Sequence, residues 1–398
     1  MSTGVRDAYI VAARRTPVGK AGRGIFRRTR PDDLLAHAIR STLADVPSVD
    51  PGAIEDVIVG CAMPEGEQGM NVARIGLLLA GLPDRVPGVT VNRFCASGLQ
   101  SVAQAADRIR LGDSDLILAG GTESMSLIPM MGARPAFNPR IFDDADIAIA
   151  YGMGITAERV ATRWEVSRED QDAFALESHR RAIAAQDAGH FDAEIAPYEV
   201  IHHDPEPAAG EVRESRFTAQ ADEGPRRDTD PDKLAKLRPA FAAKGSVTAG
   251  NSSQTSDGAA AVLVASEDAV RRHGLEPLAR FCGYSVAGVP PEIMGIGPIE
   301  AIPRVLDRTG IALADIDWIE LNEAFAAQSL AVMRTVGLDP ARVNPLGGAI
   351  ALGHPLGATG AVRTATVVHG LHRTGGRYGM VTMCVGTGMG AAGVFERV

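Results

Sequence analysis

Cysteine is scarce in this chain of 398 residues, which contains only Cys61, Cys95, Cys282 and Cys384. The four are far apart and form no CxxC pair, so neither a disulfide framework nor a cysteine-based metal site is expected. Free thiols are typical of a reducing compartment. We therefore predict a cytoplasmic protein without a bound metal ion.

Aromatic side chains and long hydrophobic runs are also few. Aromatics make up 5% of the chain, and the net charge is −9, which is unlike a nucleic-acid-binding surface. Apolar runs such as residues 75–82 fall far short of the ~20 residues that span a bilayer, and residues 1–20 hold no apolar signal core. We expect a soluble protein with no nucleic-acid partner and no membrane insertion.

Glycine, by contrast, is abundant, with 44 residues and no collagen-like period, which predicts many tight turns and close backbone approaches. Short apolar runs alternate with helical patterns, as is typical of an α/β protein with a layered sheet. The expected strands are 54–60, 115–121, 317–321 and 379–384, and the expected helices are 32–45, 71–80, 96–111, 168–188, 325–336 and 357–371.

The first and last thirds of the chain echo each other. Residues 54–60 (IEDVIVG) match residues 316–321 (IDWIEL), which predicts two similar sheet domains from one ancestral unit. The alternative is that any two α/β segments look alike. Residues 1–123 with about 250–276 would form the N-terminal domain, and residues 277–398 the C-terminal domain.

The intervening residues 124–249 differ in character and are interpreted as an inserted, loop-rich lid. Residues 202–232 are mostly polar, which is typical of a solvated face. Alternatively, Arg226 and Arg227 within them could bind an anionic ligand.

Cys95 is the first candidate for chemistry. A strand is expected to end near Asn92 and a helix to begin near Ala96, so Cys95 would lie at a helix N-terminus. There the helix dipole and free N–H groups favour the thiolate over the thiol. The alternative is an inert, buried cysteine.

Three further residues lie at similar turns. His354 lies in the glycine-rich stretch 347–360, Cys384 ends a strand before a glycine hairpin, and Asn322 lies where a strand meets a helix. Taken singly, each has an ordinary structural explanation, such as a packed loop histidine or an asparagine cap. Together, a cysteine activated by histidine and a second cysteine that moves a proton at carbon indicate acyl transfer with a carbanion step.

Long stretches of the chain resemble the thiolases, specifically the degradative 3-ketoacyl-CoA thiolases of fatty-acid β-oxidation. The matching motifs include NRFCASGLQS, AGGTESMS, VTAGNSSQTSDGAAA, NEAFAAQ, GGAIALGHPLGATG and CVGTGMG. The stretches GVPPEIMGIGP and VNPLGGAIALGHPLG are most similar to the peroxisomal-type branch. The resemblance covers nearly the whole chain and implies the thiolase fold, with two similar αβα-layered domains (αβαβα) and an inserted loop domain.

The resemblance also implies residue roles. Cys95 would be the acylated nucleophile and His354 its activating base. Asn322 would hold a water that, with His354, stabilises the thioester enolate oxygen. The backbone N–H groups of Cys95 and Gly386 would form a second oxyanion hole for the acyl-enzyme, and Cys384 would protonate the departing acetyl-CoA carbanion.

Coenzyme A is implied as co-substrate, with no permanently bound cofactor. It would lie in the lid, with Arg226 near its phosphates and the remaining contacts from Met153, Ser253, Met294, Ala324 and Phe325. Degradative thiolases are usually dimers, so a homodimer or homotetramer is expected. A hydratase or dehydrogenase of β-oxidation is a possible further partner.

The motifs say less about the acyl chain of the substrate than about the reaction. Short-chain thiolases typically carry an aromatic residue followed by His-Met-Gly, whereas this chain has Tyr151-Gly152-Met153-Gly154, which favours longer acyl chains. An acetoacetyl-CoA thiolase is the alternative. A non-catalytic thiolase-like lipid-binding protein would have lost a catalytic residue, and a decarboxylating ketosynthase would use paired histidines.

Overall fold

Ten strands form one sheet in the computed structural model, which describes residues 5–143, 147, 149, 151–206 and 210–398. The strand order is β10-β11-β12-β9-β1-β8-β5-β3-β4, with β2 beside β8. Their bounds are β1 Ala8–Arg15, β2 Gly19–Lys20, β3 Asp56–Gly60, β4 Gly88–Val91, β5 Leu116–Ser124, β8 Ser256–Ser266, β9 Ala279–Gly288, β10 Ile316–Leu321, β11 Tyr378–Val385 and β12 Met389–Arg397.

The two halves of the sheet meet at β1 and β9, where only Tyr9–Arg280 and Ile10–Ala279 are paired among the described residues. Strands from the first third and β8 lie on one side of this junction, and strands from the last third lie on the other. All the strands and helices predicted from the sequence are present within a few residues. The proposed division into domains stays a prediction.

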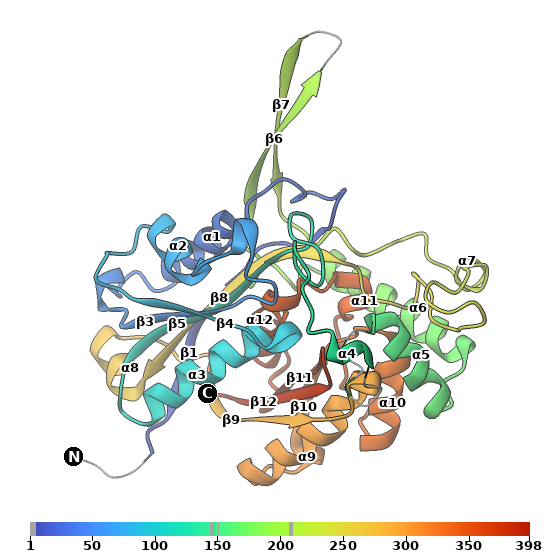
Figure 1. The fold of residues 1–398 in the computed structure, drawn as a ribbon. Coiled ribbons are helices and arrows are strands. Elements are labelled where there is room, and N and C mark those ends of the chain that lie inside the picture. Colours follow the sequence, from blue (N-terminus) through green and yellow to red (C-terminus); the bar gives the residue numbers. More distant parts are fainter. Residues whose placement is uncertain (1–4, 144–146, 148, 150, 207–209) are drawn as a thin grey trace.

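Helices α3 (Ser97–Arg110) and α12 (Leu356–Thr374) pack against each other between the two halves of the sheet (Figure 1). Glycines allow this close contact: a Cβ at Gly360 would lie 2.1 Å from the backbone nitrogen of Leu99. Helix α12 is almost entirely buried. Outer helices cover the other faces, with α1 (Pro31–Ala44) and α2 (Val72–Leu79) on one half and α9 (Gly297–Thr309) and α10 (Ala326–Val336) on the other.

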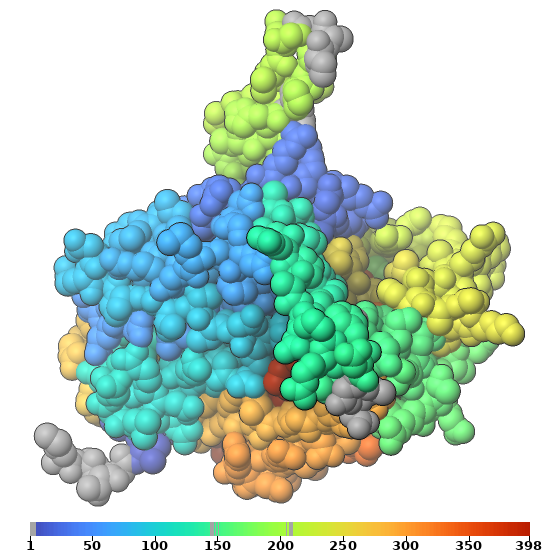
Figure 2. Space-filling view, viewed as in Figure 1, coloured from blue at the N-terminus to red at the C-terminus, as the bar shows by residue number. Residues whose placement is uncertain are grey.

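The inserted segment contains more regular structure than predicted. Its helices are α4 (Arg140–Asp143), α5 (Met153–Arg163), α6 (Arg168–Asp187) and α7 (Pro231–Ala235). Residues 202–232, predicted as a mostly polar, solvated part of a loop-rich lid, include regular structure, because β6 (Tyr198–Glu206) and β7 (Glu211–Ala219) form a hairpin that projects from the body (Figures 1 and 2). Only its base, including Val200 and Ala219, packs in the core, and the rest of the ribbon carries polar side chains together with exposed Ile201, Val212 and Phe217.

Short elements complete the chain around the site. They are α8 (Glu267–His273), α11 (Ala349–Leu352) and the 3₁₀ turns η1 (Pro51–Ala53), η2 (Gly66–Gln68), η3 (Phe94–Ala96), η4 (Pro291–Ile296) and η5 (Leu313–Asp315). Within the described part of the chain, no helix combines the length and apolar character that crossing a membrane requires.

Candidate active site

A cavity of about 210 Å³ brings together the candidate residues from distant parts of the sequence. Its wall includes Cys95 from η3, His354 from the loop between α11 and α12, and Cys384 and Gly386 at the end of β11. Asn322, which directly follows β10, places its side-chain nitrogen 3.3 Å from Nε2 of His354. The five predicted catalytic residues therefore share one site.

Cys95 lies in a turn held by side-chain hydrogen bonds. The backbone N–H of Phe94 donates to Oδ1 of Asn92 at 2.8 Å, and the hydroxyl of Ser97 donates to the carbonyl of Phe94 at 2.7 Å. Phe94 itself has a positive φ of 43°, an uncommon conformation for a residue with a side chain. This turn fixes the thiol at the start of α3 and beside the backbone N–H of Gly386.

The charge state of Cys95 differs from the sequence-based expectation of a favoured thiolate. Burial raises the pKa of the Cys95 thiol to about 11, although the N–H groups of Gly386 and Cys95 itself oppose the shift. Desolvation outweighs the helix terminus because the cavity is enclosed by apolar side chains. Near neutral pH Cys95 is therefore a neutral thiol, and a nucleophilic role would require the loss of its proton.

Alkylation of Cys95 by iodoacetamide is expected to accelerate by about tenfold per pH unit between pH 7 and pH 9.5. The raised pKa keeps the thiolate fraction small throughout this range, and that fraction grows as pH rises toward about 11. Mass spectrometry of the peptide containing Cys95 measures the rate at each pH. A plateau below pH 8.5 would show instead a preformed thiolate.

His354 is held in one orientation by Thr359. Its Nδ1 lies 2.6 Å from Oγ1 of Thr359, whose hydroxyl donates to the carbonyl of Pro355 at 3.0 Å. Since that hydroxyl proton is already used, we assign the ring proton to Nδ1, which leaves Nε2 unprotonated and facing the Asn322 amide as an acceptor. Burial, and then the charge of Arg363, lower the pKa of His354 to about 3. The imidazole is therefore neutral and can accept a proton at Nε2.

Replacing Thr359 by valine is expected to lower kcat by roughly 10–100-fold with little change in KM, because the ring loses its tautomer-fixing partner. Thr359 is fully buried on α12 and is a positioning residue that the sequence reasoning missed. Steady-state kinetics and their pH profile provide the test. Thr359→Ser keeps the hydroxyl and is expected to restore kcat, and equal losses in both variants would contradict the assignment.

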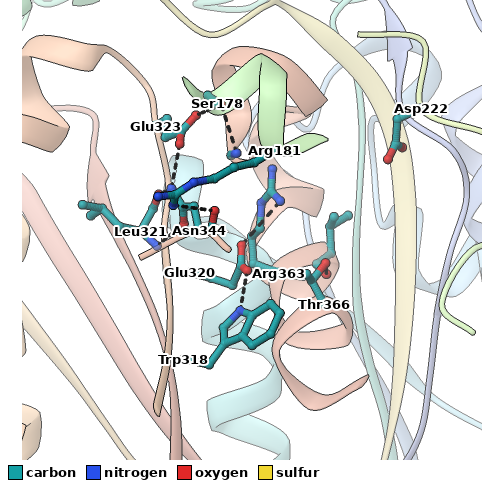
Figure 3. A network of polar contacts seen from close by, with 12 residues as sticks. Ser178, Arg181, Asp222, Trp318, Glu320, Leu321, Glu323, Asn344, Arg363 and Thr366 are labelled. Atoms are coloured by element: carbon teal, nitrogen blue, oxygen red, sulfur yellow. Dashed lines mark hydrogen bonds and ion pairs between the residues drawn. The ribbon is translucent and has the colours of Figure 1, made fainter. Parts of the chain in front are cut away.

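Asn322 and the following Glu323 are tied to the surrounding elements. The backbone N–H of Asn322 donates to the carbonyl of Thr382 on β11 at 2.9 Å. Its Oδ1 is buried and has no hydrogen-bond partner among the described residues, so it is available to a donor. Buried Glu323 accepts hydrogen bonds from Ser178 on α6 at 2.6 Å and from Asn344 at 2.8 Å (Figure 3). Glu323 thus fixes the end of β10 that carries Asn322.

Glu123 fixes a strand end in the same way on the other half of the sheet, which contains β5. Glu123 is the second-last residue of β5. Its carboxylate accepts hydrogen bonds from the backbone N–H groups of Ala62 and Gly357, each at 2.8 Å. Burial raises the pKa of both Glu123 and Glu323. Sequence reasoning missed these two glutamates, although each is a carboxylate next to a strand end in an otherwise apolar, small-residue stretch.

Cys384 is fully buried near Cys95. Burial, and then the neighbouring Cys95, raise the pKa of the Cys384 thiol far above its ordinary value. A neutral thiol beside Cys95 has a proton that it can donate, which fits the predicted role of Cys384 in moving a proton at carbon.

Five of the six predicted coenzyme A contacts line the same cavity, and Arg226 does not. The five are Met153, Ser253, Met294, Ala324 and Phe325. Arg226 is exposed, and its backbone N–H donates to Nδ1 of His179 at 3.2 Å. Arg227, the second candidate for an anion, is paired with Asp187. The coenzyme A contacts stay predictions.

Comparison with known protein families shows to which family this chain belongs. Residues 8–268 match the family described as thiolase, N-terminal domain, and residues 275–397 match thiolase, C-terminal domain. The chain belongs to the thiolase family. The predicted thiolase fold and the resemblance read from the motifs are confirmed.

Relatives of this thiolase carry names for three kinds of acyl group. It is 52% identical to the 3-ketoacyl-CoA thiolase of Bacillus subtilis (strain 168), covering 98% of this chain and 100% of the relative. It is 47% identical to the β-ketoadipyl-CoA thiolase of Pseudomonas knackmussii, covering 99% and 100%. The solved structure of the Bacillus anthracis acetyl-CoA acetyltransferase matches with a TM-score of 0.88 at 39% identity, covering 100% of both chains.

Proposed function

We propose that this thiolase cleaves 3-ketoacyl-CoA with coenzyme A to give acetyl-CoA and a shortened acyl-CoA, the thiolytic step of fatty-acid β-oxidation. The observation that carries the proposal is the convergence of Cys95, His354 and Cys384 on one cavity, with a histidine tautomer whose Nε2 can accept a proton. All four side chains that thiolase chemistry implies are present, which argues against the non-catalytic, lipid-binding alternative.

In the first half-reaction, Cys95 transfers its proton to Nε2 of His354 and its sulfur attacks the 3-keto carbon. The bond between carbons 2 and 3 breaks, the acyl group stays on Cys95, and acetyl-CoA departs as an enolate. Cys384 gives its proton to carbon 2 of this enolate and becomes a thiolate. Oδ1 of Asn322 is proposed to orient a water toward the enolate oxygen, and its lack of a partner among the described residues supports this role.

In the second half-reaction, the thiol of coenzyme A gives its proton to the Cys384 thiolate and attacks the acyl carbon on Cys95. The N–H groups of Cys95 and Gly386 are the donors proposed for the tetrahedral oxyanion. Cys95 leaves as a thiolate and regains its proton from the His354 imidazolium. Protons and charge therefore balance over the cycle without a metal ion or redox cofactor.

Coenzyme A is proposed to enter past the inserted segment, with its phosphates near Arg226. Burial, followed by the positive charges of Arg226 and Lys20, lowers the pKa of His179 to about 4, so these cations lie close together. Neither Arg226 nor Lys20 forms an ion pair within the described part of the chain, which leaves both available to phosphate oxygens.

A series of 3-ketoacyl-CoA substrates from four to sixteen carbons tests the proposed function. We expect thiolysis to extend beyond the four-carbon substrate, because Gly152 stands where short-chain thiolases carry histidine and the cavity wall is apolar. Activity confined to acetoacetyl-CoA would favour the acetyl-CoA acetyltransferase, the function named for the Bacillus anthracis structure.

A cytoplasmic homodimer or homotetramer is proposed as the working form. The outer edge of β4 is unpaired among the described strands, and exposed apolar side chains of Met70, Leu78, Leu79 and Val89 lie close by. An exposed strand edge with apolar neighbours is suited to pairing with a second copy. Light scattering at micromolar concentration measures the mass, and a monomer would contradict this part of the proposal.

A further inference from the structure

Besides the reacting groups, the cavity is lined mainly by hydrocarbon and thioether side chains, with the Tyr151 phenol as a polar exception. They are Met63, Phe94, Met130, Met131, Phe137, Ile149, Tyr151 and Leu356. No charged side chain belongs to the wall among the described residues. Positions 144–146, 148 and 150 of the same segment carry only aspartate and alanine, so they supply no cation either.

Met131 is placed on this wall by a strained turn. The N–H of Gly132 donates to the carbonyl of Pro129 at 3.0 Å, which closes a turn with Met131 at its third position. Met131 has a φ of 81°, a value that such turns normally give to glycine. Strained residues of this kind concentrate at functional sites, and here the side chain that bears the strain lines the cavity.

The cations nearest in sequence do not belong to the wall. Arg134 and Arg140 are exposed and do not line the cavity. Glu65 fixes the turn from outside by accepting the backbone N–H of Ala133 at 2.7 Å. Arg159 donates to the hydroxyl of Tyr151 at 3.0 Å and its guanidinium lies over that ring, also outside the wall.

We propose that Met130, Met131, Phe137 and Ile149 form an acyl subsite that selects neutral hydrocarbon chains and rejects acyl groups ending in a carboxylate. The inference rests on the proposed function and assigns its substrate class, since relatives of similar identity are named for the β-ketoadipyl group. Met130, Met131 and Phe137 are 40%, 41% and 38% exposed, so a carboxylate against them would lose part of its hydration and would meet no counter-charge in the wall. A terminal methyl group gains from covering these apolar side chains.

A matched pair of six-carbon substrates tests the proposal on the wild-type enzyme. 3-Ketohexanoyl-CoA and 3-ketoadipyl-CoA differ only in a terminal methyl or carboxylate group. We expect kcat/KM to favour 3-ketohexanoyl-CoA by about 100-fold or more. Equal values, or a preference for 3-ketoadipyl-CoA, would overturn the subsite assignment and leave the thiolase function standing. Failure to cleave any member of the four-to-sixteen-carbon series would instead overturn the proposed function.

Met131→Gly tests the residue itself. The variant removes the side chain from the wall and relieves the backbone strain, so we expect no loss in Tm while kcat/KM falls at least tenfold more for the ten-carbon than for the four-carbon substrate. Glu165→Gly is the matched control, because Glu165 also has a positive φ, of 52°, and is likewise exposed, but does not line the cavity. An unchanged chain-length profile in Met131→Gly would contradict the role of Met131.

Discussion

Replacing Cys95 by alanine is expected to lower kcat for thiolysis by roughly 10⁴-fold or more, because the reaction loses the atom that carries the acyl group. The fold holds this sulfur at the start of α3, beside the N–H of Gly386 and in the same cavity as His354. No other described residue offers a second nucleophile in this position except Cys384, whose thiol is still less acidic. The measurement is the rate of thiolysis, monitored as the loss of the absorbance of the 3-ketoacyl-CoA substrate.

Cys282→Ala is the matched control for this experiment. Cys282 is a partly buried thiol on β9 whose sulfur lies 3.8 Å from the carbonyl of Arg280, away from the cavity. We expect its kcat to remain within about twofold of the wild type. Retention of more than a few per cent of activity in Cys95→Ala would rule out the acyl-enzyme on this residue.

Cys384→Ala is expected to separate the two half-reactions. Cleavage of the carbon–carbon bond needs a proton at carbon 2, so thiolysis of 3-ketoacyl-CoA should fall by about 10³-fold. Exchange of the shortened acyl group between Cys95 and coenzyme A involves no proton at carbon. In the variant, His354 can take the proton from Cys95 and return it to the departing coenzyme A thiolate, so the Cys384 thiol is not needed as a base. Exchange of labelled coenzyme A into acyl-CoA should therefore continue at a rate within about tenfold of the wild type.

The same exchange assay distinguishes Cys384 from Cys95. Cys95→Ala should abolish both thiolysis and exchange, since both need the acyl-enzyme. If Cys384→Ala lost exchange as completely as thiolysis, the Cys384 thiol would be needed for acyl transfer to and from Cys95, and not only to protonate the carbanion. If it kept full thiolysis, the proton donor would be another group.

The sequence was sufficient to predict the elements that frame the site. Strands such as β3 and β11 are short apolar runs between helical patterns, and these patterns depend on local periodicity. Cys95, His354 and Cys384 could be found because each lies at an element end rich in glycine. That they meet in one cavity followed from the resemblance to a family rather than from spacing.

Other features depend on contacts that no local pattern reveals. The pKa of Cys95 is raised because side chains from distant segments enclose it, which a helix-terminus argument alone does not include. Thr359 could not be recognised as the partner of His354 without the start of α12 in place. The hairpin β6–β7 has no clear strand signal in the sequence, because most of its residues are exposed and only its base packs in the core.

The proposed acyl subsite also depends on contacts that the sequence does not reveal. Met130 and Met131 were visible in the sequence as part of a methionine-containing segment, but the turn that directs Met131 into the cavity requires coordinates. A methionine with a φ of 81° has no sequence signal, because glycine is the residue expected there. Figure 2 shows the segment before residue 144 lying across the face of the molecule, between the two halves of the chain.

The covalent intermediate is the central claim, and acid quenching during turnover measures it most directly. The enzyme is mixed with 3-ketohexanoyl-CoA without added coenzyme A, quenched, digested and analysed by mass spectrometry. The account predicts a butyryl group on the peptide containing Cys95, with the peptide containing Cys384 unmodified. Acetyl-CoA should be released in equal amount to the trapped acyl group. Acyl groups on Cys384 instead, or acetyl-CoA release with no acylated cysteine, would contradict it.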